Sequence, residues 1–129
     1  MMRNVRPLSV TILAWVYIVV GTVGFAYHFT GIYATNALRD GILTEVVEAL
    51  AIVSGAFMLR GQNWARWLAI AWMAFHVVLI AFGFVMSAFG AFRELAIHFL
   101  FFSVITWILF RPAAVRYFRG VSTQTGHPA

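Results

Sequence analysis

The sequence predicts an all-α fold, an integral membrane bundle of four helices that run up-down-up-down through the bilayer. Of its 129 residues, 63% are hydrophobic and only 10% are charged. Soluble domains have about a quarter of their residues charged. Apolar segments close to the roughly 20 residues that a helix needs to cross the hydrocarbon core recur along the chain. The connections between them are short, which favours antiparallel packing of consecutive helices.

The first two spans are expected at residues 8–29 and 42–59. The first span contains no Asp, Glu, Lys or Arg, so it is the most strongly defined of the set. The mixed stretch at residues 30–41 ends in an Arg-Asp-Gly run and predicts an outside loop. The second span is short, and Glu45 and Glu48 interrupt its apolar pattern.

The last two spans are expected at residues 64–89 and 95–110. Gly61 lies in the connection before them and supplies a stop for the second helix. Pro112 forbids much continuation of the fourth helix, because proline lacks a backbone N–H and clashes with the preceding turn. The chain is therefore expected to form one four-span domain over residues 1–119, with a disordered cytoplasmic tail at residues 120–129.

The arginines predict an orientation in the membrane. Most of them flank the two chain ends and the middle connection: Arg3, Arg6, Arg60, Arg66, Arg111, Arg116 and Arg119. The other two connections pair an arginine with an acidic residue and are close to neutral. By the positive-inside rule, both termini are expected in the cytoplasm and the protein in the cytoplasmic membrane. The net charge of +5 thus indicates orientation and contact with membrane lipid, not binding of nucleic acid.

Six ionisable side chains are expected in or near one half of the bilayer: His28, Glu45, Glu48, His76, Glu94 and His98. A charge inside the bilayer costs about 3 kcal/mol on insertion scales, so such groups are usually functional or paired. Helical spacing places each of them on a face that suits helix packing. The rise per residue puts His76 deepest and leaves Glu45 and Glu94 near the headgroup level. The sequence therefore predicts one cluster that opens outward, with His76 at its floor.

Several kinds of chemistry suit this cluster. Glu48, His76 and His98 can hydrogen-bond one another as a structural contact between helices. Intramembrane Glu and His also form proton relays. The same three side chains are of the types that bind zinc, iron or manganese, and helical bundles build metal sites from inward Glu and His. Haem would need His76 with either His98 or His28 as its axial ligands.

A quinone is a further ligand class that the cluster suits. A histidine and a carboxylate can hydrogen-bond its head group, and Trp72 and Phe101 lie on the same helical faces and can enclose its ring. The chain contains no cysteine, which excludes thiolate metal sites and cysteine nucleophiles. Its only aspartate, Asp40, falls in a predicted loop, and no Ser-His-Asp arrangement indicates a hydrolase. Whether the protein is an enzyme stays open.

Several short motifs lie within the expected spans or at their boundaries. They are a glutamate that opens the second span (Glu45 or Glu48), the run Leu59-Arg60-Gly61, the pair Ala65-Arg66, the mid-span His76, and Glu94-Leu95-Ala96 at the fourth span. With these motifs, roughly residues 10–112 resemble the DoxX-like family of small four-helix membrane proteins. The resemblance implies a membrane bundle associated with quinone-linked redox subunits.

Three functional hypotheses follow. One is a quinone-associated or redox-associated membrane subunit, and another is a non-catalytic scaffold or assembly subunit of a membrane complex. The third is a small oligomeric transporter or proton-relay protein. Stripes of small residues such as Gly21 and Gly24 favour close helix contacts, so we expect a homo-oligomer or a subunit of a larger complex.

Overall fold

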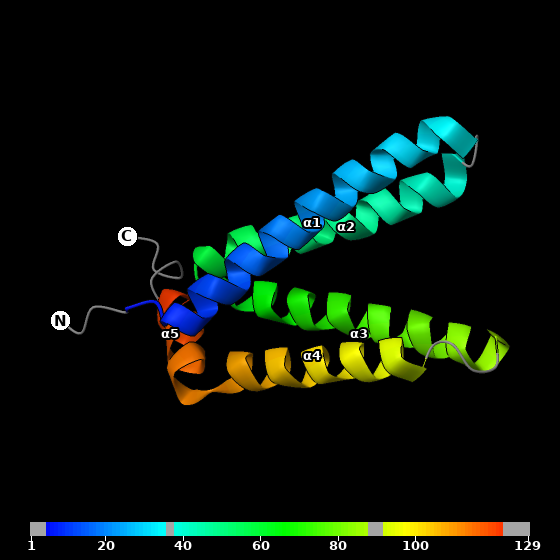
Figure 1. Cartoon of the computed structure of the whole chain (residues 1–129). Helices are drawn as coiled ribbons and strands as arrows, with labels where there is room; N and C mark the ends of the chain where they lie inside the picture. Colours follow the sequence, from blue (N-terminus) through cyan, green and yellow to red (C-terminus); the bar gives the residue numbers. More distant parts are fainter. Residues whose placement is uncertain (1–4, 36–37, 88–91, 123–129) are drawn as a thin grey trace.

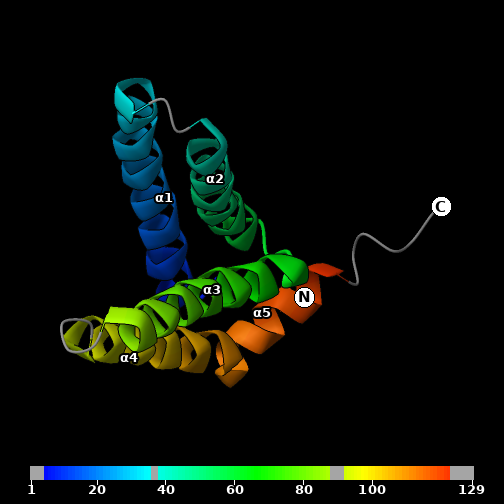
Figure 2. The same cartoon turned by 90° about the vertical axis from the view of Figure 1, so that its right-hand side faces the viewer.

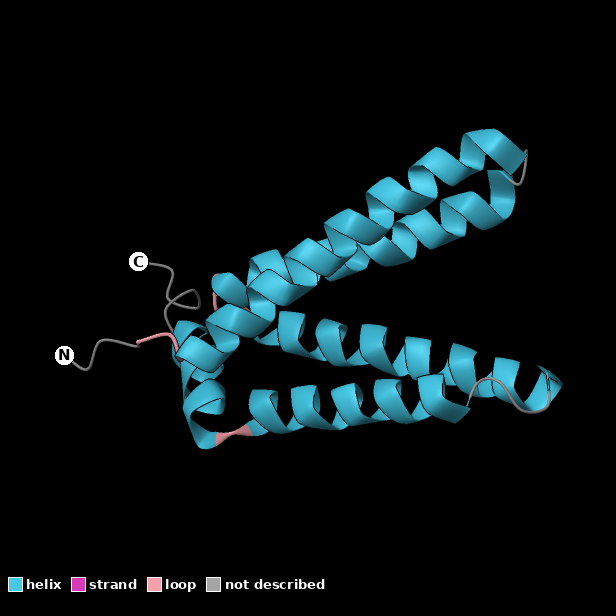
Figure 3. Cartoon of the chain, viewed as in Figure 1, coloured by secondary structure: helices cyan, strands magenta, loops and turns pink. Residues whose placement is uncertain are grey.

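The computed structural model describes residues 5–35, 38–87 and 92–122. These residues form five helices: α1 (Leu8–Thr35), α2 (Leu38–Leu59), α3 (Asn63–Ser87), α4 (Phe92–Phe110) and α5 (Pro112–Ser122). The part of the chain that the structure describes contains no β-strand, and Figure 3 shows helices joined by short loops. The predicted all-α class is therefore confirmed.

Four of the helices are long and apolar enough to cross a membrane. The spans are Leu8–Thr30, Gly41–Leu59, Asn63–Gly83 and Phe92–Phe110. No more than 28% of the most apolar window of any span is buried inside the molecule. The remaining apolar surface needs a lipid environment, because its exposure to water would be unfavourable in free energy. These four spans confirm the prediction of a small multi-pass integral membrane protein.

The helices form two hairpins that meet at one end and diverge toward the other. α1 packs along α2, and α3 packs along α4 (Figure 1). The start of α1 and the whole of α5 lie at the end where the hairpins meet, and a view turned by 90° shows the two hairpins separating from there (Figure 2). The candidate site lies where α1 faces α3 and α4.

The helix ends differ from the expected boundaries at several places. α1 continues to Thr35 and α2 already begins at Leu38, so most of the loop expected at residues 30–41 is helical. α3 ends at Ser87, and the last two residues of the expected third span lie outside the described residues. α1 and α2 each continue beyond the apolar segment that could cross the membrane. Hydropathy detects the apolar segment and not its mixed continuation.

The turn after α2 forms as the sequence predicts. Gly61 has a positive φ of 72°. Its N–H donates to Met58 O at 3.0 Å, and the N–H of Gln62 donates to Phe57 O at 3.1 Å. This pair of bonds is a Schellman motif, in which a left-handed glycine satisfies the last carbonyls of a helix. Gly61 therefore ends α2 and turns the chain into the second hairpin.

Helix α5 corrects the prediction for the C-terminal segment. The fourth helix ends at Phe110, as Pro112 predicts, but a further helix, α5, runs from Pro112 to Ser122 and so covers the first three residues of the tail expected at residues 120–129. Proline is well suited to the first position of a helix, where its missing N–H has no partner to lose. The last seven residues of the predicted tail lie outside the described residues.

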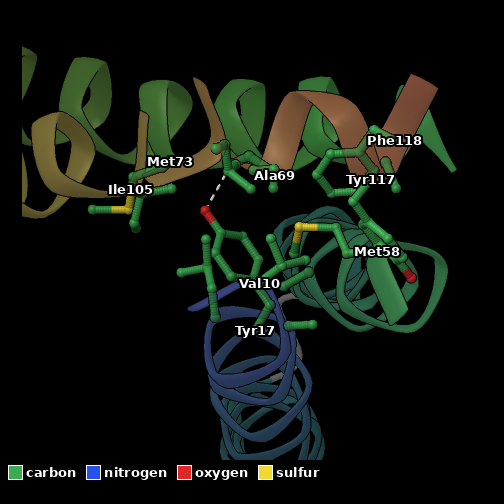
Figure 4. Packing of buried hydrophobic residues seen from close by; sticks show 14 residues of the cluster. Val10, Tyr17, Met58, Ala69, Met73, Ile105, Tyr117 and Phe118 are labelled. Carbon is green, nitrogen blue, oxygen red and sulfur yellow. Dashed lines mark hydrogen bonds between the residues drawn. The ribbon is translucent and has the colours of Figure 1, made fainter. Parts of the chain in front are cut away.

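The buried core sits where α5 meets the hairpins. Phe118 and Tyr117 of α5 pack with Met58 of α2, Val10 of α1 and other members of one buried cluster (Figure 4). The Tyr117 hydroxyl donates to Leu59 O at 2.9 Å, at the C-terminal end of α2. α5 is thus a docked helix that closes the end of the fold.

Candidate functional site

A groove between α1, α3 and α4 is a candidate binding site. Its volume is about 270 Å³. It is lined by Val16, Tyr17, Val20, Trp72, Met73, His76, Ile97, His98, Phe101 and Ile105. Four of these residues, Val16, Val20, Ile97 and Phe101, are 40–55% exposed, so the groove reaches the surface that faces lipid. We call it the lateral groove.

Two aromatic residues hold the hairpins together beside this groove. The Tyr17 hydroxyl of α1 donates to Ala69 O of α3 at 2.8 Å (Figure 4). The Trp72 indole N–H of α3 donates to Val47 O of α2 at 2.7 Å. The two rings also meet edge to face, with centroids 5.4 Å apart. Because each polar atom is satisfied, these rings can line a dry membrane groove without an unpaired donor.

Two histidines place imidazole rings on the groove wall with a defined tautomer. His76 Nδ1 lies 2.9 Å from Trp72 O, and His98 Nδ1 lies 2.8 Å from Glu94 O. A carbonyl oxygen only accepts, so Nδ1 carries the proton in both contacts. In a neutral ring this leaves the lone pair on Nε2. Each histidine therefore has Nε2 as the atom that can interact with a ligand.

A second pocket lies on the other side of His76, between α1, α2 and α3. Its volume is about 210 Å³, and we call it the Glu48 pocket. It is lined by His28, Leu43, Thr44, Val47, Glu48, Phe75, His76 and Leu79. His76 lines both this pocket and the lateral groove. The ring also packs on Trp72, with centroids 4.1 Å apart. His76 is thus the lining residue that the two cavities share.

Glu48 is a buried carboxyl group in this pocket. Its residue is 8% exposed, and its Oε2 atom is buried without a hydrogen-bond partner among the described residues. The carboxyl packs against Gly24 of α1, where an added Cβ atom would lie 2.7 Å from Oε2. His28 and His76 line the same pocket. The bare backbone at Gly24 therefore makes the room that Glu48 occupies.

Glu45 and Glu94 lie outside both cavities. Glu45 is buried one turn before Glu48, and neither of its carboxyl oxygens has a hydrogen-bond partner in the described ranges. Glu94 is in the first turn of α4 and pairs with the exposed Arg93 at 3.1 Å. A partly exposed acidic residue at a helix start suits the headgroup region, where the sequence placed it.

The three metal ligands suggested by the sequence do not come together. Within residues 5–35, 38–87 and 92–122, no group of three His, Cys, Asp or Glu side chains is placed to hold a metal ion. Glu48 lines one cavity and His98 lines the other, with His76 between them. Of the three residues, His76 alone lines both cavities.

No family model, curated protein or solved structure matches the chain. Of the predicted site residues, the lateral groove brings together His76, His98, Trp72 and Phe101, and the Glu48 pocket brings His28 and Glu48 to His76. Tyr17 was not among them, although its position one helical turn before Gly21 was a signal that it faces a neighbouring helix.

Proposed function

We propose that this integral membrane protein binds a lipid-soluble ring compound of the quinone class in the lateral groove. The observation that carries the proposal is the composition of the lining: two imidazoles and three aromatic rings, those of Tyr17, Trp72 and Phe101, on an otherwise apolar surface that reaches the lipid. The proposal agrees with the quinone-linked role that the DoxX-like resemblance implies.

The size of the groove suits a one-ring head group. Pockets that enclose drug-sized ligands have volumes of about 300–1,000 Å³. The lateral groove, at about 270 Å³, is slightly smaller, which favours a substituted single ring over a macrocycle such as haem. Because Val20 and Phe101 are exposed at its edge, an apolar tail can leave the groove directly into the bilayer.

The side chains that line the groove can contact both the faces and the edge substituents of such a ring. Trp72 and Phe101 offer aromatic surface for stacking. Nε2 of His76 and of His98 can accept a hydrogen bond from a ring hydroxyl, or donate one to a ring carbonyl when the imidazole is protonated. A groove with only two polar groups on an apolar wall orients a ligand through those groups.

Binding of a short-tailed benzoquinone to the purified protein in lipid nanodiscs tests this proposal. We expect ligand-dependent quenching of tryptophan fluorescence, since Trp72 lines the groove. His98→Gln is expected to weaken binding about tenfold, the effect of losing one hydrogen bond to a charged or polar group. Glu94→Gln is the matched control, because Glu94 lies one turn from His98 but outside the groove. Equal affinity in all three proteins would refute the site.

A scaffold role is the second candidate, and the contacts of Tyr17 and Trp72 favour it. They join α1, α2 and α3 at the place where the hairpins diverge. If these residues only hold helices, benzoquinone will leave the thermal stability of the wild-type protein unchanged. A ligand that binds the folded state raises that stability by mass action. The thermal shift therefore separates the two roles.

A further inference from the structure

We propose that the Glu48 pocket is a second binding site, which takes a lipid-soluble amine from the bilayer. The neutral carboxyl group of Glu48 binds the amine by donating its proton to the amine nitrogen in a hydrogen bond. Amine binding here does not depend on quinone binding in the lateral groove, since His76 is the one described residue that lines both cavities.

Glu48 brings to this pocket a hydrogen-bonding group that the protein leaves unsatisfied. The residue is 8% exposed, and Oε2 has no hydrogen-bond partner within residues 5–35, 38–87 and 92–122. His28 and His76 line the same pocket, yet neither bonds to this oxygen. A buried polar atom without a partner is unfavourable in free energy, so a ligand that supplies the partner is stabilised there.

The surroundings of Glu48 favour its uncharged form. Burial of a carboxylate costs far more free energy than burial of the neutral acid, unless a positive group is held beside it. No arginine is among the described residues that line the pocket, and the chain contains no lysine. Glu45 is buried one turn earlier on the same helix, and a second carboxyl group so near further disfavours a negative charge. Glu48 therefore has an O–H to donate.

An amine is the partner that suits this acid. The lone pair of an amine nitrogen accepts the O–H, and the nitrogen is a stronger base than the oxygen of an alcohol or a carbonyl group. The acid and the amine together have no net charge, whether the proton stays on the oxygen or moves to the nitrogen. The pair can therefore form inside the bilayer without an uncompensated charge. A quaternary ammonium has no lone pair, and its charge is matched only if the proton of Glu48 leaves the pocket.

The pocket is open to molecules dissolved in the bilayer. Leu43, Phe75 and Leu79 line it, and all three are exposed on the apolar surface of the spans. Cavities that enclose drug-sized ligands have volumes of about 300–1,000 Å³. A volume of about 210 Å³ therefore suits the substituted nitrogen of an amine, with its longer apolar chain left in the lipid.

Labelling with a lipid-soluble carbodiimide tests the site in the wild-type protein in lipid nanodiscs. The whole reagent adds to a neutral acid: the carboxyl proton moves to one reagent nitrogen, and a carboxyl oxygen bonds to the central carbon. We expect diisopropylcarbodiimide to modify Glu48, as measured by mass spectrometry of its peptide. N,N-dimethyloctylamine is expected to slow this reaction about tenfold at about ten times its Kd. Absence of modification at Glu48, or modification that the amine does not slow, would overturn the proposal.

Two analogues isolate the role of the nitrogen lone pair. N,N,N-trimethyloctylammonium has the same chain and a fixed charge, and 2-methyldecane has a carbon in place of the nitrogen. We expect neither to slow the modification of Glu48 at the concentration at which the amine does. Equal protection by the quaternary ammonium would refute the hydrogen bond from the acid, and equal protection by 2-methyldecane would show that apolar contact alone fills the pocket and would refute it too.

The amine-induced rise in thermal stability compares the variants, because a ligand that binds the folded state stabilises it. We expect Glu48→Gln to bind N,N-dimethyloctylamine about tenfold more weakly, since an amide is a weaker donor than the acid. Glu94→Gln is the matched control outside both cavities, and His98→Gln changes the lining of the lateral groove alone. Both are expected to keep the wild-type affinity, and a loss in His98→Gln as large as that in Glu48→Gln would place the amine in the lateral groove instead. An unchanged affinity in Glu48→Gln would refute Glu48 as the binding group. If that variant does not fold, the labelling of the wild-type protein remains the test.

Discussion

Gly55 of α2 lies directly on the backbone carbonyl of Ala14 in α1. A Cβ atom at position 55 would stand 2.5 Å from Ala14 O and 2.8 Å from Ile18 Cγ1. In a membrane, where lipid competes for every apolar contact, such close approach of small residues drives helix association. The first hairpin is therefore held by a contact that no larger residue can make.

We expect Gly55→Ala to destabilise the protein by about 1–3 kcal/mol, the range for an overpacked contact, because Ala14 O is backbone and cannot move aside. Gly83→Ala is the matched control, since nothing lies within 4 Å of a Cβ at that position of α3. Reversible unfolding in mixed detergent micelles measures both. Equal stability of the two variants would contradict the close packing of α1 on α2.

The hydroxyl of Tyr17 gives a second prediction. Tyr17→Phe keeps the ring in its buried position and removes only the hydrogen bond to Ala69 O. Interhelical hydrogen bonds in membranes contribute about 0.6 kcal/mol on average, and we expect a loss of that size. Thr22→Val is the control, because the Thr22 hydroxyl bonds only to Ile18 O of its own helix. A loss in Thr22→Val as large as that in Tyr17→Phe would show that the bond between hairpins contributes nothing specific.

The transmembrane helices could be predicted from sequence because hydropathy and charge act locally. The predicted second span ends at residue 59, as α2 does, and the glycine stop at Gly61 is present. The end of the fourth helix before Pro112 is as predicted, but helix α5 was missed because the same proline also begins a new helix. The spacing of Ala114, Tyr117 and Phe118 on one face was the overlooked signal.

The site could be predicted only in part. Helical periodicity placed Trp72, His76, His98 and Phe101 on faces that do meet at one groove. It could not show that the hairpins diverge, since that depends on contacts between residues far apart in sequence, such as Tyr17 with Ala69. The placement of Glu48 and His98 in different cavities depends on such long-range packing and had no local signal.

The docking of α5 is expected to weaken at high pH. Burial raises the pKa of Tyr117 above its ordinary value of 10.0, and the nearby Arg6 partly opposes this shift. The folded state therefore binds this proton more tightly than the unfolded state does. The resulting stability is fully present below pH 10.0 and is lost as the pH rises through the folded-state pKa.

Tyr117→Phe isolates this effect. The variant loses the bond to Leu59 O at every pH but has no group to ionise at position 117. We expect the wild-type protein to lose stability more steeply than the variant above pH 10.0, and both to behave alike between neutral pH and that value. Unfolding midpoints measured along a pH series test this. Parallel curves throughout would show that Tyr117 ionises equally well in both states.

Arg66 gives the last prediction, because its guanidinium is buried among aromatic rings. Arg66 is 6% exposed, and its Nε and Nη1 atoms have no hydrogen-bond partner in the described chain. Its Cζ lies 5.1 Å from the ring centre of Phe110 and 5.8 Å from that of Phe118. Cation–π contacts contribute about 0.5–1 kcal/mol when exposed and about 2 kcal/mol or more when desolvated.

Arg66→Lys is therefore expected to cost more than 1 kcal/mol although it keeps the charge, because an ammonium cannot stack on these rings. Arg111→Lys is the matched control: Arg111 stacks on Trp107 at 4.4 Å, but both residues are exposed. We expect a loss of about 0.5 kcal/mol or less there. Hydrogen exchange of α5 gives the local readout, since Phe118 joins α5 to Arg66. Faster exchange of α5 in Arg66→Lys alone would support the contact, and equal losses in both variants would contradict it.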